Sequence, residues 1–177
     1  MLMEALKLMA NITITSGPEE RHYRQSRNVE LSTLKFIKDN TDLDWTGVTI
    51  VKSWTQLDKA ENPIICALLN DTDYTRNELG STAFRNTYIF TIDIFATSDG
   101  QRIDLSDYLL DILNPGWAYY EISQVSGANR TLVYTEVGRC RIDSILDNTK
   151  VDLGAMGSVK DKYRQNIILS VTVGCNS

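Results

Sequence analysis

One short motif among the carboxylates of this chain is similar to the start of a metal-binding loop. Asp42-Leu43-Asp44-Trp45-Thr46-Gly47 has the aspartate and glycine spacing with which an EF-hand calcium loop begins. The twelfth position is Ser53, where such a loop supplies a bidentate glutamate, and a strand-like segment follows. A turn from a helix into a strand uses Asp and Gly for its own backbone conformation. We therefore expect a turn here rather than a calcium site.

A second carboxylate pattern is a row of three aspartates, Asp104, Asp107 and Asp111, on one face of a predicted helix. Paired carboxylates can hold magnesium or hydrolyse a glycoside, but a second wall of the site must oppose them. The solvated face of an amphipathic helix has the same pattern, and we expect that structure here. The enzyme alternative is a metal-dependent hydrolase with a carboxylate-only site. It requires Asp42, Asp44 or Asp104 to converge in one pocket with another acidic group.

Histidine and cysteine form no pattern that predicts catalysis. His22 is the single histidine and lies in a charged stretch without a nucleophile elbow nearby. Cys66, Cys140 and Cys175 are far apart and include no CxxC pair, so their spacing predicts no zinc site. Cys66 and Cys140 fall in apolar strands, where a buried thiol behaves as a small hydrophobe. The chain also has no phosphate-binding glycine motif. We predict that it is not an enzyme and has no catalytic, cofactor or metal residues.

Composition and charge are those of a globular protein. The 177 residues are 42% hydrophobic and 23% charged, which suits one domain with a real core. The net charge of −5 is uneven, because residues 39–121 carry −9 while residues 1–38 and 122–177 each carry +2. An acidic centre is a poor profile for a nucleic-acid binder. No apolar run is long enough to span a bilayer and the N-terminus lacks a basic leader, so we expect no membrane partner and no export signal.

Hydrophobic periodicity predicts two helices and a set of strands that must position these side chains. Ser16-Gly17-Pro18 breaks the chain, so residues 1–18 form an arm and residues 19–177 form a single domain. Helices are expected at 27–39, with an apolar side marked by Leu31 and Leu34 together with Val29 and Phe36, and at 101–113, with Leu105, Tyr108, Leu109 and Ile112 facing the core. Strands are expected at 48–54, 63–69, 84–96, 117–125, 131–137, 138–146 and 163–173. The predicted fold class is α+β: a mainly antiparallel sheet packed with two α-helices, an extended N-terminal arm and a long β-hairpin.

The remaining segments are typical of subunit contacts. Two long polar connections are expected, at 70–83 and 149–161, and such loops are usually functional. The candidate interface residues come from the arm, a basic stretch with three-residue spacing and the two loops: Ile12, Ile14, Arg21, Arg24, Arg27, Tyr74, Arg76 and Met156. A third class of function is a carbohydrate- or protein-binding module that uses exposed Trp117 and Tyr119 as a platform.

One stretch is similar to a known family. Tyr88-Ile89-Phe90-Thr91-Ile92-Asp93-Ile94-Phe95-Ala96 is followed by Asp99-Gly100-Gln101-Arg102 and then by Leu105-Ser106-Asp107-Tyr108-Leu109-Leu110. A long apolar strand, a short Asp-Gly break and an amphipathic helix in this order resemble the tail terminator, or tail-completion, proteins of tailed bacteriophages. The order of elements matches over residues 27–173, and the residue-level likeness covers residues 85–113.

The resemblance implies a structural virion protein. Members of that family form a hexameric ring that caps the finished tail tube and joins it to the head–tail connector. The partners would be further copies of the chain together with tail tube and head connector proteins. DNA would pass through the ring without specific binding, and the ring would be assembled in the host cytoplasm. The extended arm and long hairpin depart from the smallest members, which leaves another neck or tail component as an alternative.

Overall fold

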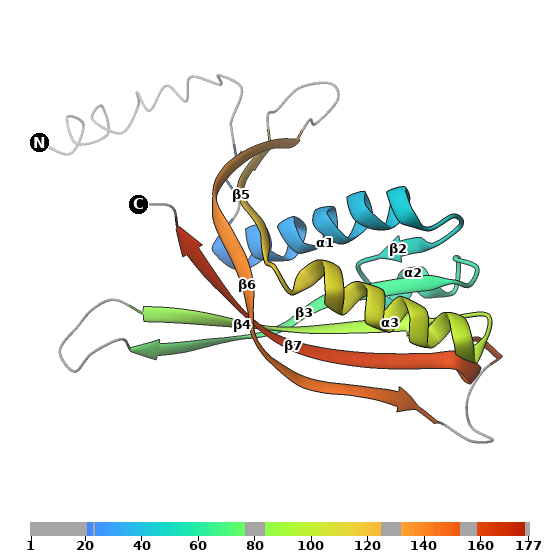
Figure 1. The fold of residues 1–177 in the computed structure, drawn as a ribbon. Coiled ribbons are helices and arrows are strands. Elements are labelled where there is room, and N and C mark those ends of the chain that lie inside the picture. The colour runs from blue at the N-terminus through green and yellow to red at the C-terminus, as the bar shows by residue number, and fades with distance from the viewer. Residues whose placement is uncertain (1–20, 23, 77–83, 125–131, 153–158, 176–177) are drawn as a thin grey trace, which may run out of the picture.

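Seven strands form one sheet in the order β1-β5-β6-β7-β4-β3-β2 (Figure 1). The structure is a computed structural model that describes residues 21–22, 24–76, 84–124, 132–152 and 159–175. Its elements are β1 (Arg21–His22), α1 (Gln25–Asp44), β2 (Thr49–Val51), α2 (Trp54–Leu57), β3 (Ile64–Arg76), β4 (Phe84–Phe95), α3 (Asp99–Leu113), β5 (Trp117–Gln124), β6 (Leu132–Val151), the 3-10 helix η2 (Val159–Tyr163) and β7 (Arg164–Cys175). The protein is mixed α/β, as the sequence predicts.

Most neighbouring strands run antiparallel, and β2 is the exception. It pairs in parallel with the first three residues of β3, whereas the other pairs between described strands are antiparallel. The strand β6 is unusually long. Its first part pairs with β5 as far as Cys140, and its second part pairs with β7 from Gly138 onward. One strand therefore passes from the hairpin into the centre of the sheet.

Helices α1 and α3 cover the same face of the sheet. Val29 and Ile37 of α1 and Leu105 and Leu109 of α3 are fully buried in one cluster with the inward face of β4. That face consists of Tyr88, Phe90, Ile92 and Ile94, which alternate along the strand as the period of two predicts. A smaller cluster on the opposite face contains Ile64, Cys66, Phe95, Val51 and Leu57. The short helix α2 contributes Leu57 to this second cluster, so β3 is buried on both faces near its start.

The helix α1 buries a face that hydrophobicity alone does not reveal. Its buried residues include Ser32, Thr33 and Thr41, while Leu31 and Leu34 are only partly buried. The predicted apolar side of α1 is therefore only partly the core side: Val29 is fully buried and Leu34 packs against the main cluster, while Leu31 does not belong to it. Small hydroxyl side chains let the helix approach the sheet closely and satisfy polar groups there. The Oγ of Ser32 accepts a hydrogen bond from the backbone N–H of Tyr120 at 3.0 Å, beside the β-bulge between Tyr119 and Tyr120.

The turn from α3 into β5 requires a glycine. Gly116 has a φ of +78°, and a Cβ atom there would lie 2.6 Å from the carbonyl oxygen of Cys140. Substitution would meet both backbone strain and a backbone clash. The other end of α3 has a side-chain cap, because Ser98 Oγ accepts from the backbone N–H of Gln101 at 3.2 Å. The Asn114-Pro115-Gly116 stop that the sequence predicts coincides with the observed end of the helix.

Several predicted boundaries were wrong. The helix expected at 27–39 extends over Gln25–Asp44, and the strand expected at 48–54 is limited to Thr49–Val51 because Trp54 begins α2. The expected polar loop at 70–83 is strand as far as Arg76. The two strands expected at 131–137 and 138–146 are one strand, β6. The arm at 1–18 lies outside the described residues.

Candidate functional site

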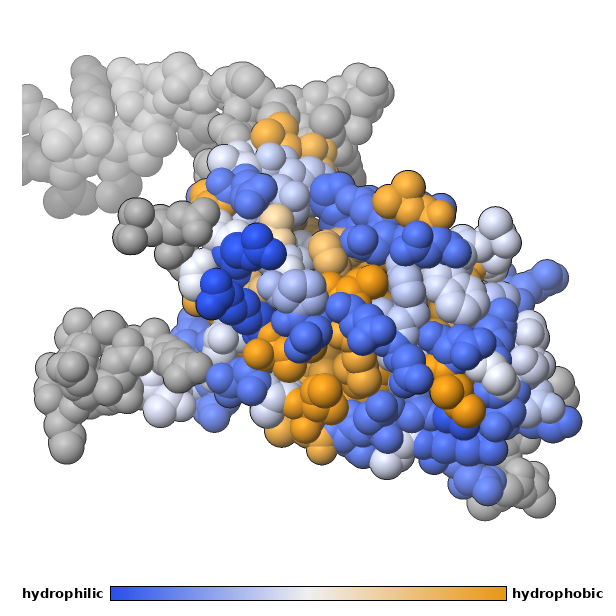
Figure 2. Space-filling view, viewed as in Figure 1, coloured by the Kyte–Doolittle hydropathy of each residue, from blue (hydrophilic) through white to orange (hydrophobic). Residues whose placement is uncertain are grey.

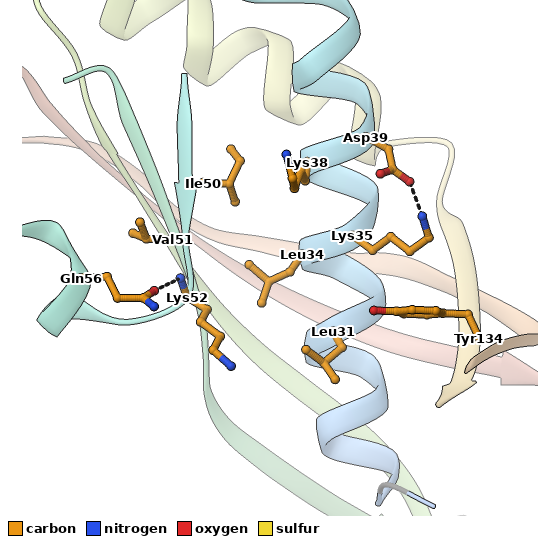
Figure 3. A pocket seen from close by; sticks show the side chains of 10 residues that line it. All are labelled: Leu31, Leu34, Lys35, Lys38, Asp39, Ile50, Val51, Lys52, Gln56 and Tyr134. Carbon is orange, nitrogen blue, oxygen red and sulfur yellow. Dashed lines mark hydrogen bonds and ion pairs between the residues drawn. The ribbon is translucent and has the colours of Figure 1, made fainter. Parts of the chain in front are cut away.

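A groove lies along the exposed side of α1, and we call it the α1 groove. It is about 480 Å³ in volume and lies between α1 and the edge strand β2, with one residue from α2 and one from β6 (Figure 3). Its lining residues are Leu31, Leu34, Lys35, Lys38, Asp39, Ile50, Val51, Lys52, Gln56 and Tyr134. Figure 3 shows Leu34 pointing from α1 toward Val51 and Ile50 of β2. The leucines expected in the core therefore line this groove.

Helical spacing explains the chemistry of the groove wall. Leu31, Leu34, Lys35 and Lys38 follow one another at three- and four-residue steps, so they share one face of α1. On this face Leu34 points toward β2, whereas Lys35 points to the other side of the helix, toward Asp39 and Tyr134 (Figure 3). Lys52, which directly follows β2, adds a third ammonium group from the opposite wall (Figure 3). The resulting surface can bind an apolar group that carries a negative charge.

Two of these lysines are held by acids one helical turn away. Lys35 Nζ lies 2.6 Å from Asp39 Oδ2, and this interaction raises the pKa of the lysine. Lys38 Nζ lies 2.5 Å from Asp42 Oδ2. Exposed pairs of this kind contribute only about 0.3–0.5 kcal/mol each, so a partner's carboxylate can replace the helix's own. Lys52 has no ion pair within the part of the chain that the structure describes.

The hairpin forms the far end of the groove. The ring of Tyr134 lies beneath the ammonium group of Lys35, whose nitrogen is 5.7 Å from the ring centroid. Tyr134 also contacts Tyr120 of β5 edge to face, with ring centroids 5.8 Å apart. The contact with Lys35 joins the β5–β6 hairpin to α1, and the contact with Tyr120 lies within the hairpin; Tyr134 remains 38% exposed. A cation and an aromatic ring at one place form an adaptable contact surface.

A buried ion pair lies on the opposite face of the sheet. Asp93 of β4 is fully buried, and its Oδ1 lies 2.9 Å from a guanidinium nitrogen of Arg164 and 3.1 Å from the amide of Asn166. Arg164 also packs against the rings of Trp54 and Phe95, at 4.7 and 5.1 Å from their centroids. Planar stacking and a fixed fork of donors make arginine suited to such a site. The arrangement ties β4, β7 and α2 together.

The two buried cysteines, Cys66 and Cys140, are not nucleophiles at neutral pH. Burial and, next, the negative charge of Asp93 raise the pKa of the Cys66 thiol to about 11. Burial alone raises the pKa of Cys140 to about 12. Both thiols are buried, as expected from their apolar strands. Because the thiolate is the reactive form, these residues serve as core packing.

The structure separates the basic candidate residues. Arg21 lies in β1, Arg24 precedes α1 as its N-cap residue, and Arg27 lies in the first turn of α1. The three-residue spacing of these arginines therefore does not correspond to one continuous helix. Tyr74 and Arg76 lie in β3 rather than in a loop, and Tyr74 is 59% exposed. Ile12, Ile14 and Met156 lie outside the described residues.

The carboxylate candidates do not converge. Asp42 and Asp44 lie in the last turn of α1, which corrects the expected turn, and Asp44 accepts a hydrogen bond from the Tyr108 hydroxyl at 2.9 Å. Asp104, Asp107 and Asp111 are exposed on α3. Within the described ranges, no group of three or more His, Cys, Asp or Glu side chains has the arrangement of a metal site.

Trp117 and Tyr119 do not form an exposed platform. They are 1% and 4% exposed, and the indole Nε1 of Trp117 donates a hydrogen bond to Thr33 Oγ1 at 3.2 Å. The platform prediction was wrong because these rings pack under α1. The sequence reasoning missed the α1 groove, although Leu31-x-x-Leu34-Lys35-x-x-Lys38 carries its signal. Apolar and basic residues at helical spacing describe a contact face as well as they describe a core face.

Comparisons with known proteins identify no family. Neither a scan against protein-family models nor a search of curated proteins finds a match for this chain. Among the described residues, no helix is long and apolar enough to cross a membrane.

Proposed function

We propose that this chain is a structural subunit of a tailed-phage virion, a tail terminator that forms a ring on the tail tube and joins it to the head–tail connector. The observation that carries this proposal is a pair of open strand edges on opposite sides of one sheet. Each edge bears exposed apolar side chains. A subunit with two different adhesive edges associates head to tail, which produces a ring when the rotation closes.

The first open edge belongs to β3. Its residues 64–66 pair with β2, but residues 67–76 pair only with β4 among the described strands. An unpaired edge presents free N–H and C=O groups to another chain. Tyr74, 59% exposed, lies on this edge, and a large amphipathic ring is a common anchor at protein interfaces.

The second open edge belongs to β6. Beyond Cys140, residues 141–151 pair with β7 on one side and with no described strand on the other. Two consecutive apolar residues, Ile145 and Leu146, are 51% and 55% exposed there. Figure 2 shows hydrophobic residues at several places on this face of the molecule, between hydrophilic ones. Exposed apolar groups that gather at a strand edge are typical of contact surfaces.

The charge distribution and the finer architecture support the same proposal. If the acidic segment 39–121 lines the ring lumen, DNA passes through without binding, because like charges repel. The β5–β6 hairpin and the arm at 1–18 provide further contact elements for the tail tube and the head connector. The ring is proposed to be hexameric and to be located in the virion after assembly in the host cytoplasm. Another neck or tail component would use the same edges.

The two other classes of function have less support. A carboxylate-only hydrolase needs Asp42, Asp44 or Asp104 to meet in a pocket, but Asp42 pairs with Lys38 and Asp44 with Tyr108. A binding module based on Trp117 and Tyr119 would need those rings to be exposed, and both are buried.

The mass of the assembled particle tests the proposal. Purified protein should sediment as one discrete species with six times the chain mass, and electron microscopy should show a ring. Added tail tube protein should bind to one face of that ring. Loss of the gene should leave heads and tails unjoined. The proposal fails if the concentrated protein stays monomeric with and without tail tube protein and virions lacking it are normal.

A further inference from the structure

The α1 groove has more positive charge than its own chain neutralises. Its lining includes Lys35, Lys38 and Lys52 but only one acid, Asp39. The pairs of Lys35 and Lys38 are exposed, and Lys52 has no ion pair among the described residues. The groove floor is aliphatic, with Leu31, Leu34 and Ile50 all partly buried. Its natural occupant is a segment that presents aliphatic side chains beside carboxylates.

The volume of the groove matches a small number of side chains. At about 480 Å³ it falls within the range of about 300–1,000 Å³ in which proteins bind compact ligands. Two large aliphatic side chains with their backbone fit such a space. Bound there, their apolar surface would leave water, which favours binding.

One described segment of the same chain has the complementary chemistry. Residues 143–147, which we call the β6 bulge segment, run Asp143-Ser144-Ile145-Leu146-Asp147. The two central side chains are about half exposed and are flanked by an aspartate on each side. Consecutive side chains of a regular strand point to opposite faces. Here the register shifts between Ile142 and Ser144 and again between Ile145 and Asp147, and such bulges re-aim side chains.

The β6 bulge segment cannot reach the groove of its own copy. The groove is built on β2, at one end of the strand order, while residues 141–151 form the open edge of β6. The strands β7, β4 and β3 lie between them (Figure 1). The two surfaces therefore face different neighbours in any assembly, which is the geometry of a head-to-tail contact.

We propose that the α1 groove of one copy binds the β6 bulge segment of the next copy. Ile145 and Leu146 pack on Leu31, Leu34 and Ile50, and Asp143 or Asp147 pairs with Lys52. The proposal rests on the assembly proposed above, and it names the two surfaces that meet. Charge complementarity sets the register of the contact, while the aliphatic side chains provide its affinity.

Charge reversal tests the polar half of the contact. Lys52→Glu places an acid opposite the aspartates of the next copy. The dissociation constant of the assembly, measured by dilution, should rise at least about tenfold. The matched control is Lys59→Glu, which changes the net charge equally at an exposed lysine outside the groove. It should assemble as the wild type does. The double variant Lys52→Glu/Asp143→Lys should regain affinity, and a variant that merely misfolds would not.

Mixing two assembly-deficient variants tests the direction of the contact. Lys38→Glu/Lys52→Glu should prevent binding at the α1 groove while leaving the β6 bulge segment intact. Ile145→Asp/Leu146→Asp should disable the β6 bulge segment while leaving the groove intact. Each should be monomeric alone, while an equimolar mixture should form a one-to-one pair and nothing larger. Ile103→Asp, an equally exposed residue on α3, is the control and should assemble normally.

The outcomes separate this contact from the proposed function. If the wild-type chain forms a ring and all the groove and segment variants form the same ring, the contact is wrong and the structural role stands. If the wild-type chain is monomeric at every concentration and also with tail tube protein, the proposed contact and the proposed structural role are both wrong. Pairing in the mixture together with rescue by Asp143→Lys supports the contact.

Discussion

Asp93 and Arg164 form an ion pair 2.9 Å long in which the carboxylate has no exposure to solvent. Each partner belongs to a different strand, since Asp93 lies in β4 and Arg164 begins β7. The second carboxylate oxygen of Asp93 is buried without a hydrogen-bond partner. The arginine is therefore the main compensation for a charge that has been removed from water.

Removal of the arginine should destabilise the fold strongly. Arg164→Met leaves the buried Asp93 charge with the Asn166 amide but without its cation, and breaking a buried ion pair in this way costs about 3–5 kcal/mol. The double variant Asp93→Asn/Arg164→Met should recover part of this loss, because the buried group is then neutral. Urea denaturation at one fixed protein concentration measures both effects. Equal stability of the single and double variants would contradict the argument.

The contact between α1 and the sheet depends on hydroxyl groups. Thr33→Val keeps the side-chain volume but removes the acceptor for the indole N–H of Trp117, which is 3.2 Å away and buried. An unsatisfied buried donor costs about 1–3 kcal/mol. The control is Thr135→Val on β6, where the side chain is exposed and valine favours a strand. Thermal unfolding should separate the two variants, and equal midpoints would show that the indole N–H finds another partner.

The N-terminal cap of α3 is a third measurable contribution. Ser98→Ala removes the acceptor for the Gln101 N–H, and loss of such a cap costs about 1 kcal/mol. Ser98→Asn should retain most of the stability, since asparagine caps helices as well as serine does. A denaturation midpoint for the alanine variant equal to that of the wild type would show that this cap contributes nothing.

The fold could be predicted from the sequence where one physical signal dominates. In β4, apolar residues alternate with polar ones for a dozen positions, and the observed strand closely matches the predicted one. In α1, by contrast, the buried face includes Ser32, Thr33 and Thr41 beside the apolar Val29 and Ile37, and hydrophobic periodicity cannot recognise the three hydroxyl residues. The reason is tertiary. Ser32 and Thr33 are buried where the Tyr120 N–H and the Trp117 indole need acceptors, and those two donors lie about 85 positions away in sequence.

The candidate site was less predictable than the fold. Leu31 and Leu34 were assigned to the core because an apolar pair at helical spacing usually lies there. Only the position of the short strand β2 shows that they line a groove, and a three-residue strand has too weak a signal to place. The β6 bulge segment was hidden for a related reason. Register shifts expose Ile145 and Leu146, whereas regular alternation predicts Leu146 to face inward.

The buried cysteines should resist alkylation. The pKa values of Cys66 and Cys140, raised to about 11 and about 12, leave almost no thiolate at neutral pH, and burial blocks access. In a Cys175→Ser background, a maleimide should label the folded protein negligibly and label both thiols in denaturant. Peptide mapping by mass spectrometry identifies the labelled residue. Rapid labelling of Cys66 in the folded state would show that its strand opens locally.

Tyr108 links α1 to α3 and predicts how stability responds to alkaline pH. Burial and, next, the hydrogen bond to Asp44 raise its pKa from 10.0 to about 12. The unfolded chain releases this proton at the lower pH, so the folded state binds more protons between the two values. Stability from this group is complete below pH 10 and is lost as the pH rises toward about 12. The raised pKa values of Cys66 and Cys140 act in the same direction.

Tyr108→Phe should remove the tyrosine's share of that response. Its unfolding free energy near pH 7 should be slightly lower than that of the wild type, because the exposed Asp44 loses one hydrogen bond that water can replace. Between pH 10 and 12 its stability should fall less steeply, because the substituted ring has no proton to release. Denaturation curves at stepped pH give the slopes, and tyrosinate absorbance follows the ionisation directly. Superimposable slopes for the two proteins would mean that Tyr108 ionises equally easily in the folded and unfolded chains.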